Sequence, residues 1–168
     1  MNRFIINYTP DLIARDLCDK HVVKMPLEEA QMLCTTLRLH APEYAKHTDL
    51  YRAVHQKHPC TIWAGLSRAN FEFSLEMFRW MCNEYTHRYG KTHASWRLWD
   101  ALVEGAEFVP DGLLTPHPEC FSEHTDLKSG KSWPLESYRK FYMTKQRRFN
   151  MVWTKRPVPE WFVPEEVA

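Results

Sequence analysis

Residues 19–31 read DKHVVKMPLEEAQ and combine a polar seam with apolar positions at helical spacing. His21, Lys24, Glu28 and Gln31 recur at intervals of three and four, so on a helix they share one face. Apolar residues occupy much of the remaining circumference. The stretch therefore predicts a helix that carries an imidazole, an amine, a carboxylate and an amide along one side. Such a seam is either a solvated face with one core histidine or an acid–base or nucleophilic site.

The composition is that of one globular domain. The chain has 168 residues, of which 44% are hydrophobic and 14% aromatic, and a chain of this size can bury a substantial core. It has no run of about 18 apolar residues, and its first residues lack the pattern of a secretory signal. Its five cysteines form no CxxC pair, which argues against a disulfide framework or a zinc ribbon. We therefore expect a soluble cytoplasmic protein with no membrane partner.

Charge is unevenly distributed, although the formal net charge is only +1. Residues 128–156 contain nine Lys or Arg and one acidic residue, Glu136, and aromatic residues are interleaved among the cations. Nucleic-acid grooves use this pairing of cations with stacking surfaces. We expect Lys145, Arg147 and Arg148 to contact the DNA backbone. The alternative is an amphipathic helix with a basic outer face.

Periodicity and punctuation predict a mainly α-helical, single compact domain. Helices are expected over residues 10–17, 19–40, 59–89, 92–104 and 135–153, the last being basic and aromatic. Outside these helices the chain has an N-terminal segment over 1–8, a polar connection between the helices 19–40 and 59–89, a long irregular loop over 109–134 before the last helix, and a proline-rich tail over 154–168. Pro26 must kink its helix or start a new one.

Several stretches, in this order, resemble the pyrimidine-dimer DNA glycosylase family, the endonuclease-V-type repair enzymes. They are MNRF at 1–4, DKHVVKMPLE at 19–28, HPCTIWAGLSRANFEFSLEMF at 58–78, EYTHRYG at 84–90 and SYRKFY at 137–142. The chain also resembles small phage-encoded proteins that share the CDKHVVKM pattern. The glycosylase resemblance implies a helical fold that clamps kinked double-stranded DNA, with a free α-amine beside a glutamate on the first long helix.

The resemblance assigns roles to individual residues. Glu28 matches the family's catalytic glutamate, His21 matches a histidine seven residues before it, and Arg3 matches an arginine at the amino terminus. In the family, an amine attacks the sugar C1′ as the base leaves, while the carboxylate stabilises the cationic sugar and moves protons. We expect His21 to orient Glu28 or to donate a proton.

The nucleophile departs from the family pattern. There it is the amine of a threonine exposed by loss of the initiator Met, whereas here Asn2 follows Met1 and its size is expected to keep Met1 in place. Either the α-amine of Met1 or the side-chain amine of Lys24 then serves as nucleophile.

Substrate contacts also differ, because Leu27 and Gln31 stand where the family has arginines beside its glutamate. Gln31 and Asn70 carry amides that can read a flipped base. The other residues expected to bind DNA are Asn2, Arg3, Lys20, His58, Arg68, Lys145, Arg147 and Arg148.

The function expected from these residues is a DNA glycosylase, with AP-lyase activity, acting on a damaged or modified pyrimidine. One alternative is a base-modifying transferase on the same fold, with residues 115–117 covering a small second substrate. Another is a non-catalytic DNA-binding protein. No cofactor is expected, and no metal either, because the spacing of His55, His58 and Cys60 and the lone thiol match no recognised zinc pattern. The oligomeric state stays open.

Overall fold

The computed structural model describes residues 1–166, and every regular element within them is helical. The α-helices are α1 (Pro10–Asp16), α2 (Asp19–His40), α3 (Pro42–Lys46), α4 (Pro59–Leu66), α5 (Arg68–Tyr89), α6 (Trp99–Gly105) and α7 (Leu135–Met143). Short 3-10 helices are η1 (Ala94–Leu98), η2 (Ala106–Phe108), η3 (Ser122–Leu127) and η4 (Thr144–Arg147). The prediction of a mainly α-helical domain is confirmed. Within residues 1–166, the helices are all too short or too polar to cross a membrane.

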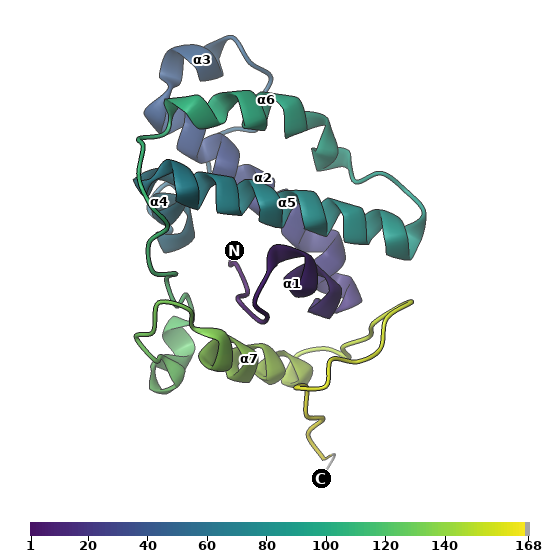
Figure 1. Ribbon diagram of the computed structural model, residues 1–168. Helices are drawn as coiled ribbons and strands as arrows, with labels where there is room; N and C mark the ends of the chain where they lie inside the picture. The colour runs from purple at the N-terminus through teal and green to yellow at the C-terminus, as the bar shows by residue number, and fades with distance from the viewer. Residues whose placement is uncertain (167–168) are drawn as a thin grey trace.

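The two longest helices, α2 and α5, pack against each other at the centre of the fold (Figure 1). Leu33 and Leu37 of α2 share one apolar cluster with Phe71 and Phe78 of α5, and all four side chains are fully buried. A single helix runs through Pro26, so no new helix starts there. The polar seam of α2 therefore lies along one continuous helix whose opposite side is anchored in the core.

The helix expected over residues 59–89 is two helices, because the chain breaks at Ser67. The backbone of Ser67 is extended, and its hydroxyl accepts a hydrogen bond from the Asn70 N–H at 3.1 Å, which caps the start of α5. Apolar positions recur across the break because α4 and α5 both pack against α2. Periodicity alone could not reveal the break, whereas the stop at Gly90, with φ of 67°, is confirmed.

The basic-aromatic helix is much shorter than the expected 135–153, because α7 ends at Met143 and η4 at Arg147. Beyond them the chain turns back toward the junction of α1 and α2. The Asp19 N–H donates to the Val152 carbonyl at 2.7 Å, and Trp153 Nε1 donates to the Asp16 carbonyl at 2.8 Å. A helix continued to Trp153 could not make these contacts, so tertiary hydrogen bonds override the local pattern.

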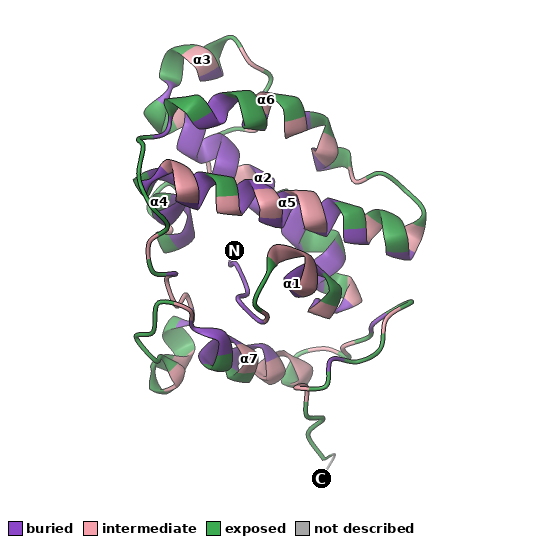
Figure 2. Ribbon diagram, in the orientation of Figure 1, coloured by how far each residue is buried: buried purple, intermediate pink, exposed green. Residues whose placement is uncertain are grey.

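Residues 2–6 of the N-terminal segment are buried and run between α7 and the layer of α4 and α5 (Figures 1 and 2), whereas Tyr8 is exposed. Ile5 and Ile6 are almost fully buried. Arg139 Nε of α7 donates to the Ile6 carbonyl at 2.9 Å, and Asn2 Nδ2 donates to the Cys120 carbonyl at 2.7 Å. These contacts fix the segment on both sides and bring Met1 against α2.

Candidate active site

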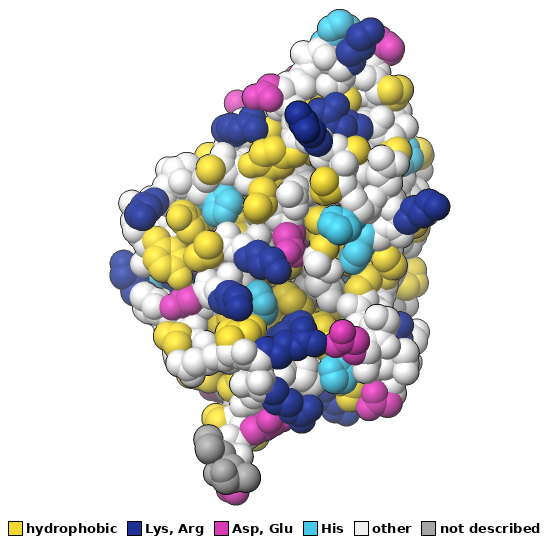
Figure 3. All heavy atoms as spheres, turned by 180° about the vertical axis from the view of Figure 1, so that it is seen from behind, with side chains coloured by type: hydrophobic (Ala, Val, Ile, Leu, Met, Phe, Trp, Pro, Cys, Tyr) yellow, Lys and Arg dark blue, Asp and Glu magenta, His cyan; other side chains and the backbone are white. Residues whose placement is uncertain are grey.

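A pocket of about 420 Å³ opens where the N-terminal segment, α2, the loop over 109–134 and α7 meet. Many of the residues predicted for the site line it, namely Met1, Asn2, His21, Lys24, Glu28, His58, Lys145 and Arg148. Figure 3 shows one face of the molecule, and Lys, Arg and His side chains gather across the middle and lower part of that face. The fold thus brings residues that are far apart in the chain into one concave site.

The carboxylate of Glu28 lies between two amines. Its Oε2 is 3.8 Å from the α-amine of Met1, and its Oε1 is 3.2 Å from Lys24 Nζ. The side chain of Glu28 is 10% exposed, whereas that of Lys24 is 58% exposed. The side chain of Met1 is only 5% exposed, so this residue is held in the pocket, whereas the Lys24 amine extends toward solvent. Of the two expected nucleophiles, Met1 therefore has the more suitable setting.

His21 lies one helical turn from Lys24 and is buried beneath the pocket surface. Its Nδ1 is 2.8 Å from the Tyr142 hydroxyl, which leaves Nε2 for the pocket. Burial, and after it the charges of Lys145 and Lys24, lower the pKa of His21 to about 3. The ring is therefore neutral at neutral pH, so it can orient a group through hydrogen bonds, whereas formation of a charged imidazolium is disfavoured. A role as a charged proton donor, one of the two expected, does not fit this environment.

Positive side chains border one side of the pocket. Lys145 Nζ lies 4.5 Å from the centre of the Phe141 ring, and burial, followed by the nearby charge of Arg148, lowers its pKa. Arg148 reaches Glu123 at 2.7 Å, and Lys20 Nζ stands 4.3 Å from the centre of the Phe149 ring. Lys20 is beside the pocket rather than in its lining. This border suits a phosphate backbone.

Arg3, expected to bind substrate, is instead a structural residue. Arg3 is 2% exposed. Two nitrogen atoms of its guanidinium donate hydrogen bonds to Oε1 of Glu29, Nη2 at 2.5 Å and Nε at 3.1 Å. The guanidinium also lies 4.9 Å from the centre of the Trp63 ring. This buried pair anchors the segment that carries Met1. No local pattern links Arg3 to Glu29, because they are 26 positions apart.

The two amides expected to read a base do not line the pocket. Asn70 is fully buried, and its Nδ2 donates to the Trp63 carbonyl at 2.8 Å and to Thr115 Oγ1 at 2.7 Å. Its Oδ1 accepts the Thr115 N–H at 2.9 Å, so the amide is fully engaged. These bonds also fasten the segment expected to cover a second substrate. Gln31 is half-buried on α2, outside the pocket lining.

Two arginines expected to bind DNA lie away from the pocket. Arg68, at the start of α5, donates to the Glu107 carbonyl at 3.1 Å and faces Asp111 at 3.7 Å. Arg147 is exposed and donates to Glu165 at 2.9 Å. Both side chains lie outside the pocket lining, so neither contributes to this site.

Part of the pocket wall comes from residues of the irregular loop that the sequence did not indicate as site residues. Residues 120–123 of the irregular loop line it, and the Cys120 N–H donates to the Tyr138 hydroxyl at 3.1 Å. The length of the loop indicated a functional segment. It did not indicate which residues face the pocket, because that depends on the contact between the loop and α7.

His117 lies in an aromatic box away from the pocket. Its ring stacks on Trp63 with centroids 4.5 Å apart and also contacts Phe73 and Trp133. Burial, and after it the charge of Arg3, lower the pKa of His117 to about 3. Among the described residues, neither ring nitrogen has a hydrogen-bond partner.

The free energy of unfolding is expected to fall as the pH drops from 6.5 toward 3, because unfolded His117 binds a proton before folded His117 does. A pKa shift of this size is worth at most about 5 kcal/mol. His117→Phe removes this contribution and keeps an aromatic ring in the box. Urea unfolding across this pH interval should show a shallower acid limb for the variant, whereas parallel curves would contradict the assignment.

The pocket thus combines an α-amine, a carboxylate and a neutral imidazole beside a basic border. Comparisons with protein-family models, with curated proteins and with solved structures found no match to this chain. The chemistry of the pocket is therefore the basis for assigning a function.

Proposed function

We propose that the protein is a DNA N-glycosylase with an associated lyase activity that acts on a damaged or modified pyrimidine in double-stranded DNA. The observation that carries this proposal is the α-amine of Met1, 3.8 Å from the carboxylate of Glu28 inside the pocket. Amines of this kind form covalent imines with sugar carbons, and a positioned carboxylate moves the protons.

The chemistry begins when the neutral amine of Met1 attacks C1′ of the deoxyribose. The bond from C1′ to the base breaks, and its electron pair leaves with the base, which takes up a proton. Glu28 removes a proton from the attacking nitrogen and delivers one to O4′, which opens the sugar and gives a protonated imine. Loss of a proton from C2′ then expels the 3′ phosphate and cleaves the strand.

The pocket also suits a nucleotide that has left the base stack. A volume of about 420 Å³ falls within the usual range of small-ligand sites, and the rings of Phe4 and Phe141 line it as surfaces for a flipped base. Lys145 and Arg148 line the same pocket and supply positive charge for the flanking phosphates.

The test is reductive trapping. The protein is incubated with duplexes that carry cyclobutane pyrimidine dimers or 5-modified pyrimidines, and borohydride is added. We expect a covalent protein–DNA adduct that mass spectrometry maps to the α-amine of Met1. An adduct on Lys24 or Lys145 would keep the glycosylase but change its nucleophile.

Failure would have a clear form. Tight binding to every duplex, without released base, adduct or strand cleavage, would overturn the glycosylase proposal. The transferase and the simple DNA-binding protein would then be separated by analysing the nucleosides of the bound DNA for added groups.

Affinity for undamaged duplex DNA is expected to depend on the basic border. The logarithm of the DNA-binding constant falls linearly with the logarithm of the salt concentration, and each phosphate contact makes that slope steeper by about 0.9. The double variant Lys20→Ala/Arg148→Ala should therefore reduce the steepness of that slope by about 2. Fluorescence anisotropy titrations measure it, with Lys46→Ala, an exposed position on α3, as the control. An equal change in the control would place the DNA elsewhere.

A further inference from the structure

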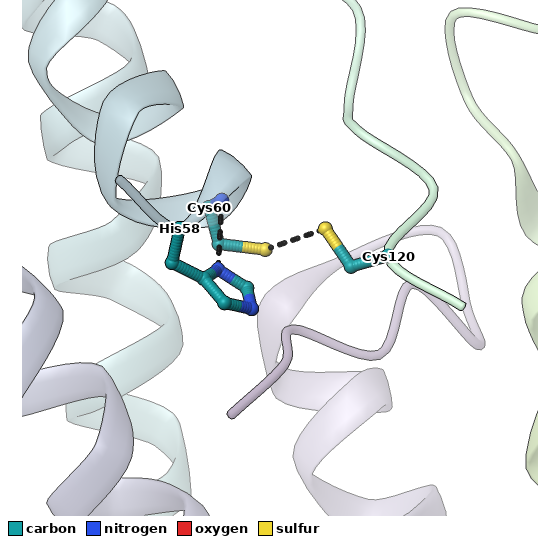
Figure 4. A group of neighbouring side chains, drawn as sticks. All are labelled: His58, Cys60 and Cys120. Atoms are coloured by element: carbon teal, nitrogen blue, oxygen red, sulfur yellow. Dashed lines mark hydrogen bonds between the residues drawn. The ribbon is translucent and has the colours of Figure 1, made fainter. Parts of the chain in front are cut away.

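The side chains of His58, Cys60 and Cys120 meet at the edge of the pocket (Figure 4). One potential ligand atom from each residue lies within 4.8 Å of the other two. The sulfur atoms of Cys60 and Cys120 are 3.4 Å apart. His58 and Cys60 belong to the start of α4, whereas Cys120 comes from the irregular loop, so the fold supplies the second thiol that the local sequence lacks.

This donor set matches zinc. Bonds of about 2.3 Å from zinc to sulfur at a tetrahedral angle place two sulfur atoms about 3.8 Å apart. The sulfur atoms of Cys60 and Cys120 are 3.4 Å apart, so they need to separate only slightly to bind zinc. Two thiolates and an imidazole form a donor set that binds zinc in preference to harder cations such as Mg²⁺ and Ca²⁺. We propose that His58, Cys60 and Cys120 bind one zinc ion through three protein ligands.

A fourth ligand to the bound zinc would come from the pocket side. Cys60 is 1% exposed and closes the inner side, whereas His58 and Cys120 line the pocket itself. Zinc sites with three protein ligands carry a water molecule or a substrate group at the open position. The metal therefore stands at the wall of the same pocket that holds Glu28 and Met1, where it can bind an oxygen or nitrogen atom of the DNA substrate.

The surroundings favour a neutral metal cluster. Two thiolates balance the charge of the ion, so burial of the complex costs less than burial of a lone cation. The backbone of Cys120 is fixed by two contacts, since its N–H donates to the Tyr138 hydroxyl at 3.1 Å and its carbonyl accepts from Asn2 Nδ2 at 2.7 Å. Such outer contacts hold a ligand in place before the metal arrives.

His58 changes one hydrogen bond when the metal binds. Its Nδ1 accepts the Cys60 N–H at 3.1 Å and caps α4, which leaves Nε2 for zinc. With zinc on Nε2, the ring proton moves to Nδ1 and the bond from the Cys60 amide is lost. One neutral hydrogen bond is weak compared with three bonds to zinc. The amide signal of Cys60 should therefore shift when zinc is added.

The test uses the full chain, reduced and freed of metal, and titrated with Zn²⁺ or Co²⁺. We expect one metal ion per chain, thiolate-to-cobalt charge-transfer bands and the visible bands of tetrahedral cobalt. Cys60→Ala and Cys120→Ser should lose these bands. Cys34→Ala changes a buried thiol in the apolar cluster between α2 and α5, and it should keep them. Circular dichroism shows that each variant is folded.

A further variant removes a metal ligand without disturbing the fold. His58→Asn retains a good N-cap residue for α4 but removes the imidazole, so we expect a normal fold and metal affinity reduced at least ~10-fold. Absence of cobalt bands in the reduced wild-type protein, or unchanged bands in Cys120→Ser, would overturn the zinc site. An intact mass that shows a Cys60–Cys120 disulfide resistant to reductant would also overturn it. These readouts do not depend on glycosylase activity.

Discussion

Glu28→Gln is expected to abolish borohydride trapping while DNA binding is retained. The amide keeps the size of the side chain but cannot take a proton from the Met1 amine or offset a cationic sugar. A positioned general acid or base contributes a factor of about 10² to 10⁴ to rate, so the single-turnover rate of base release should fall by that amount. Affinity for the duplex should stay equal or rise, because a negative charge leaves the pocket.

The matched control is Glu72→Gln, which changes an exposed glutamate on α5 and should leave rate and affinity unchanged. Rates come from quenched single-turnover reactions, and affinities come from anisotropy titrations. Undiminished trapping by Glu28→Gln would remove this residue from the chemistry. Loss of DNA binding together with activity would give it a structural role instead.

The largest loss of stability is expected when one partner of the buried Arg3–Glu29 pair is removed. Both side chains are 2% exposed, so Glu29→Gln leaves the guanidinium without its counter-charge in the interior. Breaking such a pair costs about 3–5 kcal/mol. Borohydride trapping should fall as well, because Arg3 anchors the segment that holds Met1 against Glu28.

Urea unfolding of Glu29→Gln, Arg3→Met and the double variant Arg3→Met/Glu29→Leu measures this effect. The double variant should recover part of the lost stability, because apolar side chains of similar size leave no buried charge. Arg79→Met serves as the control, since the Arg79–Glu76 pair on α5 is 36% and 44% exposed and should contribute less than about 1 kcal/mol. Equal losses in the control and in Glu29→Gln would contradict the anchoring role.

The polar seam of α2 could be predicted because its residues are neighbours along one helix. His21, Lys24 and Glu28 do line one pocket, as their spacing indicated. The substrate contacts were less predictable, since type and charge suggest a ligand but not exposure. Arg3 and Asn70 carry suitable groups, yet both are buried and engaged within the protein.

The sequence by itself determined the helical class, the extent of α1 and α2, the stop at Gly90 and the shared face of the α2 seam. These features depend on residues within a few positions of one another, where propensity, capping and periodicity leave a readable pattern. The family resemblance implied an α-amine beside Glu28, but the contact of Met1 with Glu28 is made by the tertiary structure, and only that structure showed that Cys120 meets Cys60, 60 positions away. It also ended α7 at Met143. Contacts of this kind arise from the packing of whole helices and loops, for which a single chain has no local signature.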